Sequence, residues 1–184
     1  MRLSTSTNLL ALNRSGQLTD TLECLGRCAE VGYKVFDLNF RFIHFDEFFL
    51  IHDDWEKKVD IIGNEAAKLG VEFSQSHIPY YNLDQVDKYL TDPDLNKWKE
   101  DMCKRAYYAS SMLGVKWATS HGFTAVEHNC ELKASKQKNI DYFTPYIELA
   151  KKLNVGIAIE NMCDFYGSII PRRYTAGYEE LVDL

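Results

Sequence analysis

The chain has 184 residues, 46% of them hydrophobic and 26% charged, a composition typical of a globular protein with one sizeable core. Its formal net charge of −6 and the lack of a basic block argue against an electrostatic surface for nucleic acid. No apolar run approaches the ~20 residues that span a bilayer, so we expect no membrane partner. Five cysteines, an odd number without a C-x-x-C pair, indicate reduced thiols in a cytoplasmic protein.

One pattern recurs along the chain: a helical stretch closes on Gly or Asn, and a short apolar strand follows. The closing residues are Gly32, Gly70, Gly114 and Asn154. Gly and Asn tolerate the left-handed backbone conformation that commonly ends a helix. Because the copies lie at intervals of about 40 residues, the pattern indicates a repeated supersecondary unit.

The elements expected from this pattern alternate from the first strand onward. Strands are predicted at residues 2–6, 34–39, 72–77, 116–120 and 156–160. Helices are predicted at 19–31, 54–69, 93–113 and 135–153, and 178–184 resembles the opening of another. Asp92 before Pro93 is typical of a helix N-cap followed by proline at the first helical position. Pro145 either kinks the fourth helix or marks its start.

Alternating strands and helices of these lengths imply parallel βαβ units and the α/β class. Five units fit either an open doubly wound sheet or part of a (β/α)8 barrel, which takes about 250 residues when complete. The doubly wound fold expects a glycine-rich phosphate turn after the first strand, and TSTNLLALNRSG is not one. We therefore predict a TIM-barrel type, with residues 1–184 as a single, incomplete domain that forms the amino-terminal part of the barrel.

Polar residues stand where the predicted strands end, and the carboxyl ends of parallel strands meet at one edge of a sheet. The candidate site residues at these ends are Asn8, Asp37, His77, His121, Glu160 and Asn161. Imidazole and carboxylate groups together suit a divalent metal such as zinc, manganese or cobalt. They also suit proton transfer beside a carbonyl group. The strand ends therefore predict a polar pocket with a metal or acid–base function.

At these segments the chain resembles the xylose isomerase-like TIM-barrel superfamily, in particular its sugar-phosphate isomerase/epimerase branch. The segments that carry the resemblance are MRLSTSTN, SQSHIPYYN, SHGF and IAIENM. The resemblance extends over the whole chain and corresponds to the first five of eight units.

The resemblance implies an activity and a role for each candidate residue. Glu160 would bind a divalent metal (Mn, Co, Zn or Mg) and act as the catalytic acid and base. Substrate would be bound by His77, His121, Asn8, Asp37 and Asn161. The reaction would move a proton between adjacent carbons of a small sugar or sugar phosphate through an enediolate.

The chain departs from this family pattern because the further metal ligands come from the sixth to eighth strands. We therefore expect the metal in the complete protein, expect that it can be absent from this chain, and predict that 184 residues alone are no competent enzyme. Two alternatives stay open: a hydrolase like the apurinic-site endonucleases, in which the matching histidines bind zinc, and a non-catalytic barrel fragment that acts as a binding module. Homo-oligomerisation is left open.

Overall fold

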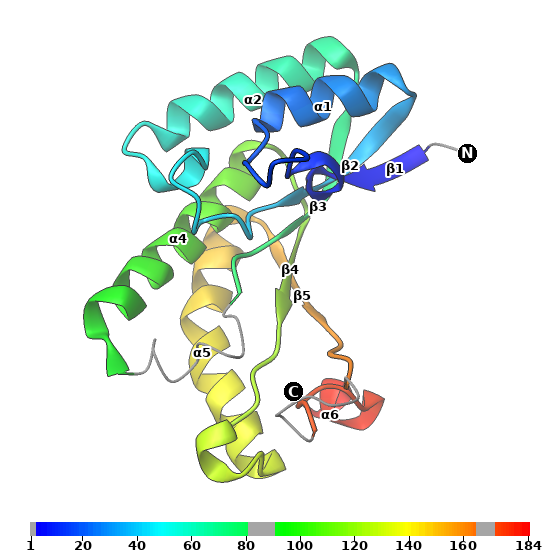
Figure 1. Cartoon of the computed structure of the whole chain (residues 1–184). Helices are drawn as coiled ribbons and strands as arrows, with labels where there is room; N and C mark the ends of the chain where they lie inside the picture. Colours follow the sequence, from blue (N-terminus) through cyan, green and yellow to red (C-terminus); the bar gives the residue numbers. More distant parts are fainter. Residues whose placement is uncertain (1–2, 81–90, 165–171) are drawn as a thin grey trace.

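The computed structural model describes residues 3–80, 91–164 and 172–184. Its centre is one sheet of five parallel strands that pair in chain order (Figure 1). The strands are β1 (Leu3–Ser6), β2 (Tyr33–Asn39), β3 (Glu72–His77), β4 (Trp117–His121) and β5 (Gly156–Glu160). The bounds of β3 and β5 are the predicted ones, and Arg2, where the first strand was expected to begin, lies outside the described residues.

The helices that connect consecutive strands form one layer over a single face of the sheet, whereas the last helix lies apart from that layer (Figure 1). In chain order the helices are α1 (Thr21–Glu30), α2 (Trp55–Leu69), α4 (Pro93–Met112), α5 (Leu132–Leu153) and α6 (Tyr178–Asp183). Three short 3-10 turns accompany them: η1 (Thr7–Leu10), η2 (Phe49–Ile51) and η4 (Val126–His128). Consecutive members of the series α1, α2, α4 and α5 contact each other, as expected for repeated parallel βα units.

Capping chemistry sets the helix ends. Asp92 accepts hydrogen bonds from the first two backbone amides inside α4, as its position before Pro93 predicts. Asp20 caps α1 in the same way, so this helix begins at Thr21 rather than at the predicted residue 19. Asn154 closes α5 in the left-handed conformation with φ of 55°. Helix α5 starts at Leu132, before the predicted residue 135. Pro145 lies in its interior and does not mark its start.

The main core lies between the sheet and the helix layer. Phe36 and Leu38 of β2 point into it, and Leu25 of α1 and Val59 of α2 meet them there. Because successive strand residues point to opposite faces, the neighbours of these apolar residues face away from the helices. That opposite face carries most of the polar strand residues predicted to form the site.

The two outer strands of the sheet are β1 and β5, each paired on one side among the described residues. The α/β class predicted from the sequence is confirmed, since the strands are all parallel and alternate with helices. Over the ranges that the structure describes, none of the helices combines the length and the apolar character needed to cross a bilayer.

Candidate functional site

The alternation of strand residues separates the site from the core. Ser76 and Ser120, next to the candidate histidines, turn towards the helix layer, where they meet the hydroxyls of Ser110 and Tyr107 on α4. Their neighbours His77 and His121 consequently point to the opposite face of the sheet. The strand pattern thus buries small hydroxyl residues against the helix layer and presents the imidazoles on the opposite face of the sheet.

Strand register brings the polar side chains together along a diagonal. Ser6 of β1 is the register partner of Asp37 on β2, and His121 of β4 is the partner of Glu160 on β5. His77 lies two residues beyond the register partner of Asp37 along β3, and His121 lies two residues beyond the partner of His77 along β4. A stagger of this kind is the geometry of strands that tilt in a barrel.

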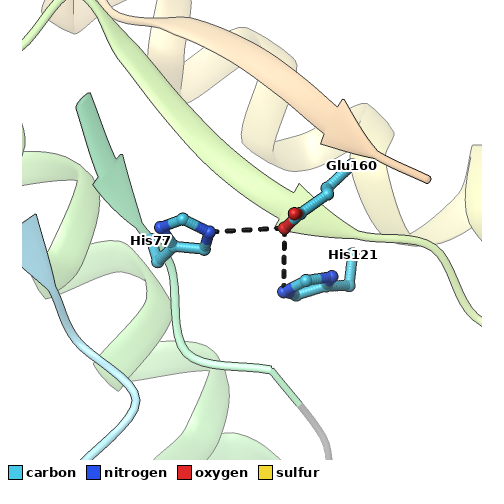
Figure 2. Close-up of side chains that lie close together, drawn as sticks. All are labelled: His77, His121 and Glu160. Carbon is cyan, nitrogen blue, oxygen red and sulfur yellow. Dashed lines mark hydrogen bonds and ion pairs between the residues drawn. The ribbon is translucent and has the colours of Figure 1, made fainter. Parts of the chain in front are cut away.

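His77, His121 and Glu160 form one cluster at the carboxyl ends of three adjacent strands (Figure 2). Glu160 Oε2 lies 3.3 Å from His77 Nε2 and 3.6 Å from His121 Nε2. The ligand atoms that the three residues offer all lie within 4.8 Å of one another. The imidazoles are mostly buried, whereas the Glu160 side chain is 45% exposed, so the cluster opens towards solvent on the glutamate side.

Asp37 stands behind His77 as seen from this cluster. Its Oδ1 lies 2.7 Å from His77 Nδ1, and its Oδ2 accepts a 2.7 Å hydrogen bond from the Ser6 hydroxyl. The Asp37 side chain is 12% exposed. The row of interacting groups therefore runs from Ser6 through Asp37 and His77 to Glu160, which lie on β1, β2, β3 and β5.

The two histidines have opposite pKa shifts. Burial lowers the pKa of His77, but the hydrogen bond and charge of Asp37, with those of Glu160, outweigh burial and raise it above the ordinary value. For His121, burial lowers the pKa, the charge of Glu160 opposes this, and the positive charge of protonated His77 lowers it further. The net shift of the His121 pKa is downward, opposite to that of His77.

The loop after His121 is held by α5. Asn139, fully buried, accepts a hydrogen bond from the Phe123 amide and donates to the carbonyls of Phe123 and Ser135. Ser135 also accepts from the amide of Ala125. These bonds fix the backbone where β4 ends and thereby the direction from which His121 enters the site.

The remaining candidates lie at the same end of the sheet without entering the cluster. Asn8 and Asn161 are exposed, and within the described residues neither side chain hydrogen-bonds to the histidines or to Glu160. Ser6, which the strand-end pattern also marks, ends β1 beside the strand that carries Asp37. Tyr80 was not among the candidates, and its ring lies edge-on to His121 with 4.7 Å between centroids.

The donor set fits a divalent metal ion. Two imidazole nitrogens and one carboxylate oxygen are the ligands of several catalytic zinc sites, which hold zinc through three protein groups and leave one position open. The same donors suit cobalt or manganese, although manganese and magnesium prefer additional oxygen ligands. Besides metal binding, the cluster offers an exposed carboxylate next to two imidazoles, an arrangement capable of proton transfer.

The sequence matches no protein-family model and no curated protein. Among solved structures, the chain is similar to a D-tagatose 3-epimerase-like protein, with 15% identity, a TM-score of 0.68, and coverage of 100% of this chain and 59% of that one. A D-psicose 3-epimerase from Clostridium cellulolyticum H10, solved with D-tagatose, gives 12% identity, a TM-score of 0.65, and coverage of 100% and 58%. The IOLI protein, solved with a bound zinc atom, gives 17% identity, a TM-score of 0.54, and coverage of 86% and 51%.

These likenesses concern the fold. The chain spans 51% to 59% of the length of the three proteins, and its five parallel βα units correspond to part of a TIM-barrel fold. The resemblance to xylose isomerase-like barrels and the fold class predicted from the sequence are both confirmed at this level.

Proposed function

We propose that the protein is a metal-dependent sugar or sugar-phosphate isomerase or epimerase whose site contains His77, His121 and Glu160. The observation that carries the proposal is the convergence of these three side chains, with ligand atoms within 4.8 Å of one another, at the strand ends of an epimerase-like fold. Active sites of TIM barrels lie at this end of the strands. Small sugars as substrates are supported by the solved structures of similar fold.

In this proposal the three residues hold the metal, which polarises the carbonyl and hydroxyl oxygens of the sugar when bound. Glu160 removes the proton from the carbon next to the carbonyl group to give an enediolate and, for isomerisation, returns it to the adjacent carbon on the same face; for epimerisation, a second acid on the opposite face would supply the new proton. Its 45% exposed side chain leaves it accessible to a substrate that enters from solvent. Asn8 and Asn161, exposed at the same end of the sheet, are proposed to hydrogen-bond the sugar hydroxyls.

The three donors of this chain are enough for zinc, which accepts three protein ligands and a water. Manganese or magnesium would need further oxygen ligands from the substrate or from other parts of the protein. Preference for zinc would therefore indicate a site of three protein ligands, whereas preference for manganese or magnesium would indicate further oxygen ligands. On this chemistry we propose that residues 1–184 bind zinc without further protein ligands. The proposal that they form the amino-terminal part of a barrel is supported by the 51% to 59% of the similar structures that they cover.

The test compares Glu160→Gln with Glu148→Gln, the same substitution at an exposed glutamate on α5. Titration calorimetry with zinc and with manganese measures the affinity, and deuterium uptake from solvent into a panel of ketohexoses and their phosphates measures proton transfer. Both measurements are made on the complete protein, since residues 1–184 alone are not expected to be a competent enzyme. There we expect Glu160→Gln to lose metal affinity and proton transfer while it remains folded, and Glu148→Gln to behave as wild type. Undiminished deuterium exchange in Glu160→Gln would contradict the assignment of the acid–base group.

A phosphodiester hydrolase like the apurinic-site endonucleases is the second candidate. The observation that favours it is the presence of two imidazoles, rather than carboxylates, at Glu160. The net charge of −6 disfavours it because binding to DNA depends on neutralising phosphates. Cleavage of a duplex with one abasic site by zinc-loaded protein, without deuterium exchange into any sugar, would select this candidate.

A further inference from the structure

Asp37 uses both carboxylate oxygens for hydrogen bonds to protein groups. Oδ2 accepts from the Ser6 hydroxyl and Oδ1 contacts His77 Nδ1, each at 2.7 Å. The side chain is 12% exposed. A carboxylate that is engaged on both oxygens and this well buried acts on its neighbours rather than on a molecule arriving from solvent.

His77 lies between two carboxylates that compete for its single proton when the ring is neutral. Asp37 is 2.7 Å from Nδ1, whereas Glu160 is 3.3 Å from Nε2. Asp37 is also the less exposed of the two, 12% against 45%, so solvent weakens its hydrogen bond less. The hydrogen bond to Asp37, which is shorter and less exposed to solvent, keeps the proton on Nδ1. The lone pair then lies on Nε2, the nitrogen that faces Glu160 and His121.

We infer that Asp37 is a positioning residue that fixes the neutral tautomer of His77 and so directs a free Nε2 lone pair into the cluster. A carboxylate partner on the second ring nitrogen is the usual way in which proteins orient a metal-binding histidine. The part of the inference that concerns metal affinity rests on the proposed function; the part that concerns the tautomer does not.

Ser6 completes this arrangement because its hydroxyl has a fixed direction. Ser6 Oγ caps η1 by accepting a 3.1 Å hydrogen bond from the Asn8 amide, and it donates its own proton to Asp37 Oδ2. The hydroxyl proton therefore points at Asp37. An Asn at position 37 would turn its amide oxygen towards Ser6 and its NH2 group towards His77, and the ring would have to accept at Nδ1 and carry its proton on Nε2.

The experiment reads the tautomer directly in protein labelled with 15N-histidine, stripped of metal and held at about pH 9, above the ordinary histidine pKa of about 6.5. Couplings between the ring nitrogens and the carbon-bound protons distinguish Nδ1–H from Nε2–H. In wild type we expect His77 to be Nδ1–H. Asp37→Asn should shift the population to Nε2–H, while Ser6→Ala, which keeps the carboxylate, should retain Nδ1–H. Asp60→Asn, an exposed site on α2, is the matched control.

Zinc titrations on the same proteins give the second measurement. Removing an outer partner of a metal-binding histidine typically lowers metal affinity by about 10–100-fold, and we expect a loss in this range for Asp37→Asn. Ser6→Ala should lose less, and Asp60→Asn should equal wild type.

The outcomes separate the two proposals. An Nε2–H ring in wild type would overturn the inference without any variant being needed, even if Asp37→Asn failed to fold. An Asp37→Asn protein with an unchanged tautomer would overturn it as well. If wild type binds neither zinc nor manganese but the tautomer responds as expected, Asp37 keeps its positioning role and the metal-dependent function fails.

Discussion

His77 and His121 occupy equivalent places at the ends of neighbouring strands, yet their pKa values are shifted in opposite directions. Their side chains are 18% and 20% exposed, so burial alone would affect both alike. His77 has a second carboxylate, Asp37, at 2.7 Å, and this reverses the effect of burial and raises its pKa. Among the residues that the structure describes, His121 has one carboxylate partner, Glu160 at 3.6 Å, and its pKa is lowered. The comparison shows that similar burial does not fix the direction of the pKa shift: the carboxylate of Asp37 raises the pKa of His77, whereas burial prevails for His121.

The two histidines are also held by different means. His77 is oriented by side chains on adjacent strands, through Asp37 and Ser6. His121 owes its position to the loop that follows β4, which Asn139 fastens to α5. Substitution of Asp37 or Ser6 should therefore affect His77 and not His121, and substitution of Asn139 should affect His121 and not His77.

The largest effect on stability is expected for Asn139→Ala. This substitution removes the hydrogen bonds that Asn139 makes with the amide and the carbonyl of Phe123 and with the carbonyl of Ser135, and each such bond contributes ~0.5–1.5 kcal/mol. We expect the free energy of unfolding in urea to fall by about 3 kcal/mol. Asn64→Ala, at an exposed site on α2, is the control and should change stability little.

The same variant also tests whether the two histidines are positioned independently of each other. Asn139→Ala should disturb the ring resonances of His121 while the tautomer of His77 stays as in wild type, since no strand that carries Asp37 or Ser6 is altered. Equal disturbance of both rings would show that the two sides of the site are not independent.

Much of this fold could be predicted from the sequence because its signals are local. The left-handed residues Gly70 and Asn154 end their helices as expected, and the strands that follow begin where the apolar runs begin. The start of α5 was wrong because two residues with positive φ, Asn129 and Cys130, turn the chain early. Neither is a glycine, so the turn gives little signal in the sequence.

The convergence of His77, His121 and Glu160 followed from parallel strand ends, but the contacts around them did not. Asp37 reaches His77 because the register offsets their strands by two residues, a property of sheet tilt that no single segment encodes. The role of Asn139 could not be predicted from the sequence either. A polar residue in a helix does not reveal which backbone groups it will meet 16 residues earlier in the chain.

A smaller effect is expected at Gly122, the first residue after His121. A Cβ atom here would lie 3.1 Å from Thr175 Oγ1 and 3.2 Å from Thr175 Cγ2, and Thr175 is fully buried and has little room to yield. We expect Gly122→Ala to lower the free energy of unfolding by about 1 kcal/mol. Gly26→Ala in α1, where a Cβ meets nothing within 4 Å, should raise it by roughly 0.5–1 kcal/mol. A stabilised Gly122→Ala would contradict the close contact with Thr175.

The subtlest expected effect is the opposite pH response of His77→Gln and His121→Gln in chelator-treated protein. The raised pKa of His77 contributes stability that is present below the unfolded pKa of about 6.5 and is lost as pH rises through the folded pKa. The lowered pKa of His121 costs stability as pH falls through about 6.5 towards its folded value.

Urea unfolding at about pH 5 and about pH 8 measures the change in stability between the two conditions. Going from alkaline to acid, His77→Gln should lose stability relative to wild type and His121→Gln should gain it. Because the charge on His77 lowers the pKa of His121, the NMR titration of His121 should also move to higher pH in His77→Gln. Responses of the same sign in both variants would mean that burial, rather than Asp37, governs the two imidazoles alike.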